Sequence, residues 1–331
     1  MVGRTVVAAD GGRRLAVGSW GPEDGYPVFL LHGTPGSSLG PRPRTRDLHL
    51  SGIRLIAYDR PGYGGSDRLP DRRVVHAAAD VEAIASAFGL EEFSVVGRSG
   101  GAPHALACAA ELPHLVRSVA VLASLAPPDT RELPLSDGDG ASWFDGMTQS
   151  NIVAFKSADE NVEALRKELL NRRSAMNADP EQIIADLGAE LSAGDRRIVM
   201  ETGVRKMLVD NFSAAFAEPA VYEDRGITTS EYGLDGWYDD VLSFVKPWGF
   251  EISEVLVPTL LWHGELDRFS PIGHFHWLAE HIEGARAVIE ADRAHFGAVQ
   301  ALPRVLRWLV TAARPRTALA GAGEARTGVR A

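Results

Sequence analysis

The chain has 331 residues, of which 45% are hydrophobic and 24% charged. This length and composition predict either one large α/β domain with an insertion or two ordinary domains. The formal net charge is −10, which argues against a nucleic-acid partner because phosphate binding needs a basic surface. No apolar run reaches the roughly 18 residues that a membrane helix needs.

The N-terminal stretch and the cysteine usage indicate a cellular compartment. Met1 to Asp10 contain only a short apolar run and do not predict a secretory signal. The single cysteine, Cys108, excludes an internal disulfide, and its place in an apolar helical segment is typical of a packed core thiol. We therefore expect a cytoplasmic protein without a membrane partner.

Strands and helices alternate through the first part of the chain. Residues 5–7 and 15–19 flank a glycine turn and predict a hairpin. Apolar runs predict buried strands at 28–31, 53–58, 93–96 and 116–122, and apolar residues at helical spacing predict helices at 74–88 and 102–110. This alternation indicates a mainly parallel sheet with helices on both faces, in which ligands bind at the carboxyl ends of the strands.

A glycine-rich turn, Gly97-Arg98-Ser99-Gly100-Gly101, joins one of these strands to the helix that follows it. G-x-S-x-G alone is a weak pattern, but a strand before it and a helix after it are the context that a nucleophilic serine requires. The sharp turn would expose the Ser99 hydroxyl on a strained backbone. The amide of Gly100, at the helix N-terminus, would then face developing negative charge.

Two other loops follow buried strands. The loop at 32–36 reads as an ordinary turn by itself, but upstream of a strand-turn-helix unit it is where a second backbone donor, the N–H of Thr34, is expected. His32 is interpreted as a structural histidine. Asp59 begins a second glycine-rich loop, and we favour a structural role in which its carboxylate accepts backbone N–H bonds.

Residues 128–250 break the alternation. After a link rich in proline, aspartate and glycine, helical spacing predicts helices at 143–155, 162–172, 181–187 and 196–216, with no convincing strand. A helical insertion between two halves of a sheet is typical of a lid. Its aromatic residues are mostly expected in its core, but Trp143, Phe144 and Trp237 are candidates to line an apolar pocket. Asp239 and Asp240 are interpreted as a solvated face.

The sheet pattern resumes with strands at 257–262 and 287–290 and helices at 271–282 and 299–313. Asp267 follows the first of these strands and His295 the second, so both should reach the sheet edge that carries Ser99. Ser, Asp and His in this order along the chain form one of the known layouts of a catalytic triad. His274, His276 and His281 do not share one helix face, so we predict no metal site. The tail at 314–331 is expected to be disordered.

These motifs together resemble the α/β-hydrolase superfamily with a helical cap. The resemblance rests on five strand-end motifs in order, at 32–36, 59–66, 97–101, 263–267 and 294–296, and it covers about residues 6–313. It implies an α/β-hydrolase fold with core segments 1–127 and 251–313 and a cap at 128–250. It further implies Ser99 as nucleophile, Asp267 as acid, His295 as base, and the Thr34 and Gly100 amides as oxyanion hole, without a cofactor.

The sequence also departs from some relatives. Ala294 stands where many relatives have glycine before the histidine. Arg98 precedes Ser99, whereas proline-releasing aminopeptidases carry Gly-Gly-Ser-Trp-Gly at this turn, so we do not expect their substrate class. Ser99 excludes the alkyl-enzyme mechanism of relatives that carry aspartate at this turn. Arg98 could form an ion pair or reach the crevice.

Three functions remain open from the sequence. The first is hydrolysis of an ester, lactone or thioester of a small, largely apolar molecule through an acyl-Ser99 intermediate, with Phe296 among the expected pocket residues. The second is carbon–carbon bond hydrolysis, cyclisation or elimination in the same pocket. The third is a small-molecule receptor or scaffold, because fold alone does not define function.

Overall fold

A computed structural model describes residues 4–130, 133–134, 140–178, 190–217 and 234–313. Its centre is an eight-stranded sheet in the order β1-β2-β4-β3-β5-β6-β9-β10, in which only the β1–β2 and β2–β4 pairs are antiparallel. The strands are β1 (Thr5–Ala9), β2 (Arg13–Trp20), β3 (Tyr26–Leu31), β4 (Ile53–Tyr58), β5 (Phe93–Arg98), β6 (Val116–Leu122), β9 (Thr259–Gly264) and β10 (Arg286–Glu290). The predicted fold class, including the N-terminal hairpin, is confirmed.

Helices cover both faces of this sheet. On one face lie α2 (His76–Ala87), α3 (Gly101–Glu111) and α10 (Ile272–His281), and their apolar side chains share one buried cluster with the sheet. On the other face lie α1 (Thr45–Leu50) and α11 (Gly297–Ala312), which form a second cluster. Because both faces are covered, the central strands are continuous apolar runs, as the sequence indicated.

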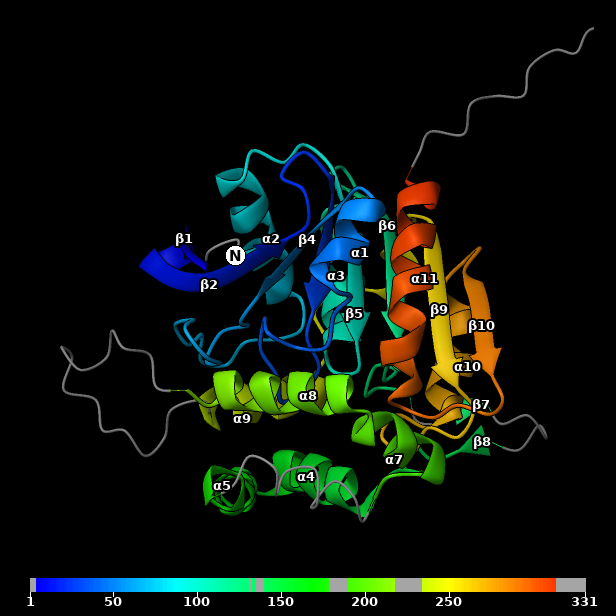
Figure 1. Cartoon of the computed structure of the whole chain (residues 1–331). Helices are drawn as coiled ribbons and strands as arrows, with labels where there is room; N and C mark the ends of the chain where they lie inside the picture. The colour runs from blue at the N-terminus through cyan, green and yellow to red at the C-terminus, as the bar shows by residue number, and fades with distance from the viewer. Residues whose placement is uncertain (1–3, 131–132, 135–139, 179–189, 218–233, 314–331) are drawn as a thin grey trace, which may run out of the picture.

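The inserted segment, residues 128–250, lies between β6 and β9 in the chain. Its described helices are α4 (Gln149–Glu160), α5 (Val162–Ala178), α7 (Ala193–Met200), α8 (Thr202–Ala215) and α9 (Leu234–Val245). Figure 1 shows these helices gathered at the end of the sheet to which the arrowheads of β5 and β9 point. They therefore lie over the strand ends where the sequence predicted the site. Division into core and cap domains at the predicted boundaries stays a prediction.

Several predicted elements of the inserted segment were wrong in detail. Two short strands, β7 (Leu133–Pro134) and β8 (Gly140–Ala141), pair antiparallel where no strand was expected. The helix expected to start at residue 143 begins at Gln149, because residues 142–147 form turns closed by backbone bonds. The single helix expected over 196–216 is two helices, since Glu201 leaves the helical conformation between them with ψ 124°. The helix predicted at 181–187 and the tail at 314–331 lie outside the described residues.

Candidate active site

Ser99 occupies a strained turn between β5 and α3. Its φ is +53°, a left-handed conformation that costs a non-glycine residue free energy and is often found at functional sites. Two neighbouring glycines make the turn possible. A Cβ on Gly97 would lie 2.6 Å from the Cα of Ala102, and one on Gly101 would lie 2.5 Å from the carbonyl oxygen of His32. The strained serine and the close approach of strand and helix agree with the turn that the sequence predicted.

Gly100 is needed for the space that it leaves beside Thr34. Its backbone is right-handed helical, with φ −54° and ψ −15°, so the turn does not require the conformational freedom of glycine at this position. A Cβ there would instead lie 2.7 Å from the Cβ of Thr34 and 3.0 Å from Cζ of Phe244. Glycine is needed at position 100 because it lets the 32–36 loop approach the N-terminus of α3.

Asp267 and His295 meet at the ends of β9 and β10. Asp267 Oδ2 lies 2.8 Å from Nδ1 of the His295 ring. The other carboxylate oxygen accepts backbone N–H bonds from Phe269 at 2.8 Å and from Ser270 at 3.0 Å. These bonds fix the carboxylate, which in turn fixes the orientation of the imidazole and leaves Nε2 as its free nitrogen.

Charges around His295 set the proton affinity of its ring. Burial by itself lowers the pKa of His295, but the charge and hydrogen bond of Asp267 outweigh burial and raise it above the ordinary 6.5. Asp195 of α7 raises it further, and the positive charge of Arg98 opposes this. The pKa of Asp267 is lowered: burial favours the neutral acid, but the contacts with His295 outweigh it. Asp267 is thus ionised beside a histidine that gains protons readily.

Ser99 and His295 line one cavity of about 580 Å³ that lies between the strand ends and the inserted segment. This volume suits a small organic ligand. No hydrogen bond joins the Ser99 hydroxyl to His295 among the described residues, and such contacts are often longer without substrate. The side of the cavity formed by the inserted segment is lined by Ser150, Asn151, Ala154, Phe155, Asn171, Arg172, Glu190, Leu208, Asn211, Phe212, Trp237, Val241 and Phe244.

The other predicted residues divide into two groups. Thr34, Gly100, Trp237 and Phe296 all line the cavity. Trp143 and Phe144 are not among its lining residues, which corrects the expectation for both. The Trp143 indole donates to the carbonyl oxygen of Ala126 at 3.1 Å and packs edge-on against His274, so it anchors the start of the inserted segment.

The predicted structural roles of His32 and Asp59 are confirmed by their hydrogen bonds. His32 Nε2 accepts the backbone N–H of Arg60 at 3.1 Å, so its Nδ1–H donates to the Gly33 carbonyl at 2.8 Å. Burial, followed by the charge of Arg60, holds the pKa of His32 well below 6.5. The Asp59 carboxylate accepts backbone N–H bonds from Ser38 at 2.7 Å and Gly65 at 3.1 Å.

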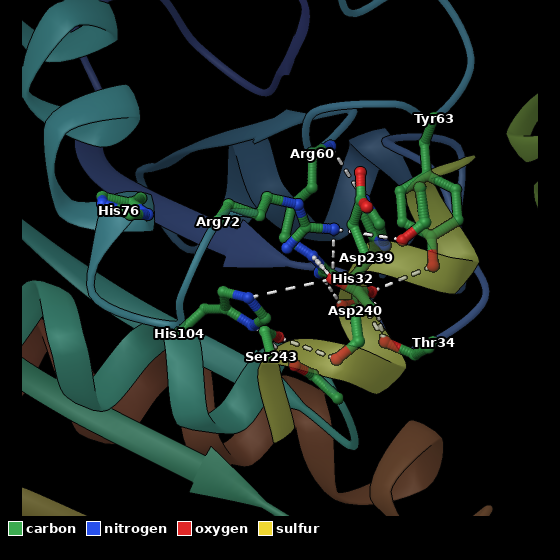
Figure 2. Close-up of polar contacts among 12 residues, drawn as sticks. His32, Thr34, Arg60, Tyr63, Arg72, His76, His104, Asp239, Asp240 and Ser243 are labelled. Carbon is green, nitrogen blue, oxygen red and sulfur yellow. Dashed lines mark hydrogen bonds and ion pairs between the residues drawn. The ribbon is translucent and has the colours of Figure 1, made fainter. Parts of the chain in front are cut away.

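The prediction of a solvated face at Asp239 and Asp240 was wrong. Asp240 is fully buried and Asp239 is 2% exposed. Asp240 accepts from Arg60 at 2.5 Å, from Arg72 at 2.6 Å and from the Tyr63 hydroxyl at 2.9 Å, and Figure 2 shows these groups converging on one carboxylate. Burial alone would raise the pKa of Asp240, but Arg60 and Arg72 hold it well below 3.8. A signal was available: Trp237, Asp240 and Phe244 share one helix face, so the carboxylate interrupts an apolar stripe.

Sequence reasoning also missed two other polar residues of the inserted segment. Asn211 of α8 accepts the backbone N–H of Ser37 at 2.8 Å through its side chain. Asp195 of α7 accepts the backbone N–H of Phe296, next to His295, at 2.7 Å. Both are buried. No local pattern marks them, because their partners are more than 100 positions away in the chain.

Comparisons with known proteins agree with this architecture. A family model described as alpha/beta hydrolase fold matches residues 26–301, and the chain belongs to this family of enzymes. It is 26% identical to 2-hydroxymuconate semialdehyde hydrolase of Pseudomonas putida, with 92% of each chain covered. It is 33% identical to a non-heme chloroperoxidase of Burkholderia pyrrocinia, over 76% of this chain and 78% of that one. The structure of an enol-lactonase from Burkholderia xenovorans superposes with a TM-score of 0.63 at 16% identity, covering 93% of this chain and all of the other.

In the described part of the chain, no group of three or more histidine, cysteine, aspartate or glutamate side chains is arranged to hold a metal ion. None of the described helices is both long and apolar enough to cross a membrane.

Proposed function

We propose that the protein is a serine hydrolase that cleaves an ester, lactone or thioester of a small, largely apolar molecule. The observation that carries this proposal is the Asp267–His295 hydrogen bond of 2.8 Å at the rim of a cavity that Ser99 also lines. The strained backbone of Ser99 supports it, because that conformation suits an exposed nucleophile. The inserted segment would act as a cap over the cavity.

The proposed reaction proceeds through an acyl-enzyme. His295 Nε2 takes the proton of the Ser99 hydroxyl while Oγ attacks the substrate carbonyl, and the resulting imidazolium is stabilised by Asp267. The backbone N–H groups of Thr34 and Gly100 donate to the oxyanion. When the intermediate collapses, His295 returns the proton to the leaving oxygen or sulfur. A water molecule, activated by the same histidine, then hydrolyses acyl-Ser99.

Labelling with a fluorophosphonate probe tests this proposal. We expect the wild type to be labelled on Ser99, as identified by peptide mapping, and Ser99→Ala and His295→Ala to lose labelling while remaining folded. Turnover of short 4-nitrophenyl esters should fall by about four powers of ten in Ser99→Ala. Retained turnover in this variant, or labelling at another residue, contradicts the proposal. A folded wild type that neither labels nor turns over esters would favour a receptor or scaffold.

Cleavage of a carbon–carbon bond is a second candidate, favoured by the similarity to 2-hydroxymuconate semialdehyde hydrolase along 92% of the chain. In that reaction the leaving group is a carbanion equivalent that must be protonated at carbon. Incubation in deuterated water separates the two reactions. A product with new carbon-bound deuterium indicates carbon–carbon cleavage, whereas release of an alcohol or thiol indicates ester chemistry.

A further inference from the structure

The geometry points to Asp240 of α9 as a positioning residue that holds the oxyanion loop, residues 32–36, in the form that catalysis requires. This inference rests on the proposed function, because it assigns Thr34 a role in the oxyanion hole. Asp240 lies in the inserted segment and Thr34 in the loop after β3, 206 positions apart in the chain. The cap would thus contribute to the reaction and not only enclose the substrate.

The contact with Thr34 is the central observation. The Thr34 hydroxyl donates to Asp240 Oδ2 at 2.5 Å and accepts from Arg60 Nη2 at 3.1 Å. Figure 2 shows Thr34 and Arg60 approaching Asp240 together. A side chain held by both a donor and an acceptor has little freedom. Because the Thr34 side chain is bonded to the backbone of the same residue, holding it also restricts the direction of the Thr34 N–H.

Arg60 extends this control along the loop. The buried guanidinium donates to the carbonyl oxygen of His32 and, at 3.2 Å, to that of Gly33, while Asp240 anchors it. The Arg60–Asp240 pair therefore fixes three successive residues of the loop. Oxyanion donors must be in place before the charge develops, because reorganisation during the reaction reduces their benefit.

Buried charges hold Asp240 in place. Two guanidinium groups, Arg60 and Arg72, share the carboxylate of Asp240, and the neighbouring carboxylate of Asp239 also acts on Arg72. His104 lies 3.9 Å from Asp240 and stays neutral, since burial lowers its pKa to about 3. A buried ion pair is weak evidence for stability by itself, whereas the Thr34 contact acts where the oxyanion forms.

Thr34→Val tests the inference with little change of shape. It removes the hydroxyl that binds Asp240, and we expect kcat for 4-nitrophenyl esters to fall about tenfold or more while KM changes by less than about threefold. Thr34→Ser keeps the hydroxyl, so its kcat should fall less than that of Thr34→Val. Asp240→Asn should also lower kcat. Its matched control is Asp239→Asn, which removes the negative charge that pairs with Arg68 and should leave kcat unchanged.

Hydrogen–deuterium exchange gives a readout that does not depend on turnover. In Asp240→Asn the peptide covering residues 31–39 should exchange faster than in Asp239→Asn, with no change in peptides of β5. Equal exchange in both variants, or unchanged kcat in Thr34→Val, overturns the inference. If the wild type hydrolyses no ester, the proposed function fails, and the exchange data still decide whether Asp240 orders this loop.

A second, independent observation concerns Arg98. This residue lines the cavity, and its Nη1 is buried without a hydrogen-bond partner; no carboxylate pairs with it among the described residues. The other charged lining residues are engaged: Glu190 accepts from the backbone N–H of Ser150 at 2.8 Å, and Arg172 lies against the Trp237 ring. Burial lowers the pKa of Arg98 to about 10, so it remains charged at neutral pH.

We infer that Arg98 binds a carboxylate, or a similar planar anion, on the substrate. A guanidinium nitrogen that is buried without a hydrogen-bond partner is costly, and carboxylates match the donors of arginine in a bidentate fashion. Arg98 immediately precedes Ser99, and its charge acts on His295, so the anion would lie within a few bonds of the scissile group. The preferred substrate would be an apolar ester or lactone that carries one carboxylate, which rests on the proposed hydrolase function.

Monomethyl adipate and its uncharged ω-amide form a matched pair of esters for this test. We expect wild-type kcat/KM to be about tenfold or more higher for the carboxylate ester than for the amide ester. The ratio of these two kcat/KM values should approach one in Arg98→Met and should stay higher in Arg98→Lys, which keeps the positive charge. A wild type without this preference, or Arg98→Met that keeps it, overturns the inference. If neither ester is cleaved, thermal stabilisation by monomethyl adipate in wild type but not in Arg98→Met supports the anion site without hydrolysis. Absence of that stabilisation refutes it.

Discussion

At the scale of single residues, the site depends on close approaches that only small side chains permit. Ser99 takes a left-handed backbone because Gly97 and Gly101 let the strand and helix meet. Gly100 keeps an ordinary helical backbone and makes room for Thr34. The sequence pattern located all three glycines, but only the structure shows that Gly100 is required because Thr34 lies against it.

Gly100→Ala should displace the oxyanion loop. The added Cβ would lie 2.7 Å from the Cβ of Thr34, too close for van der Waals contact, so one of the two proposed oxyanion donors must move. We expect kcat for esters to fall roughly 100-fold, as for loss of one oxyanion donor. Gly203→Ala in α8 is the control, since an added Cβ there has no atom within 4 Å. Wild-type kcat in Gly100→Ala would contradict this interpretation of the glycine.

The pH dependence of activity should follow His295. In its proposed role as general base, His295 must be neutral in the free enzyme, and its pKa is raised above 6.5. We therefore expect kcat/KM to decline as pH falls, with an acid limb above pH 6.5. Its neighbours act with opposite signs: Arg98→Met should move the limb to higher pH and Asp195→Asn to lower pH. Rate profiles between pH 5 and 9 measure both shifts, and displacement in the same direction would contradict them.

At the scale of secondary-structure elements, helices of the inserted segment hold loops of the sheet. Helix α9 binds the oxyanion loop through Asp240, α8 binds Ser37 through Asn211, and α7 binds Phe296 through Asp195. In α4, the Asn151 side chain donates to the Phe269 carbonyl at 3.0 Å. Four helices thus contact the loops that carry Thr34, Asp267 and His295.

Two substitutions of Asp195 separate the effect of its hydrogen bond to Phe296 from the effect of its charge. Asp195→Asn keeps an oxygen that can accept the Phe296 N–H, whereas Asp195→Ala removes the acceptor and leaves this N–H unsatisfied. We expect kcat to fall about tenfold more in the alanine variant, because the His295 loop loses its support. Steady-state kinetics on a 4-nitrophenyl ester measure this, with the exposed Asp210→Asn as control. Equal kcat values in the two Asp195 variants would show that the hydrogen bond does not hold the loop.

At the scale of the whole molecule, the buried carboxylates couple stability to pH. The pKa of Asp240 in the folded protein is held well below its ordinary 3.8 by Arg60 and Arg72. Its contribution to the free energy of unfolding is therefore fully present above pH 3.8 and is lost as pH falls through the lower folded-state value, because the unfolded chain binds the proton first. Urea unfolding between pH 6 and 3 should show the beginning of this loss below pH 3.8 in the wild type and a smaller one in Asp240→Asn. An identical pH dependence would contradict the assignment.

The sequence by itself determined the alternation of strands and helices, the parallel sheet and the three loops that carry Ser99, Asp267 and His295. These features are readable because they depend on local periodicity, on glycines at a tight turn and on the rule that parallel strands end at one edge. Even the structural role of Asp59 followed from the glycines beside it. The boundaries within 128–250 were less readable, because helix starts and breaks there depend on contacts with other segments.

Only the tertiary structure decided what surrounds the proposed triad. Asp240 read as a solvated residue because its partners Arg60 and Arg72 lie 180 and 168 positions away, and a charge is buried only where distant partners offset its desolvation. The same holds for Asp195 at His295 and for Arg98, whose unpaired guanidinium is apparent only once the cavity around it is known. The chemistry of the loops is encoded locally, whereas their positions and the charges around them arise from packing between segments far apart in the chain.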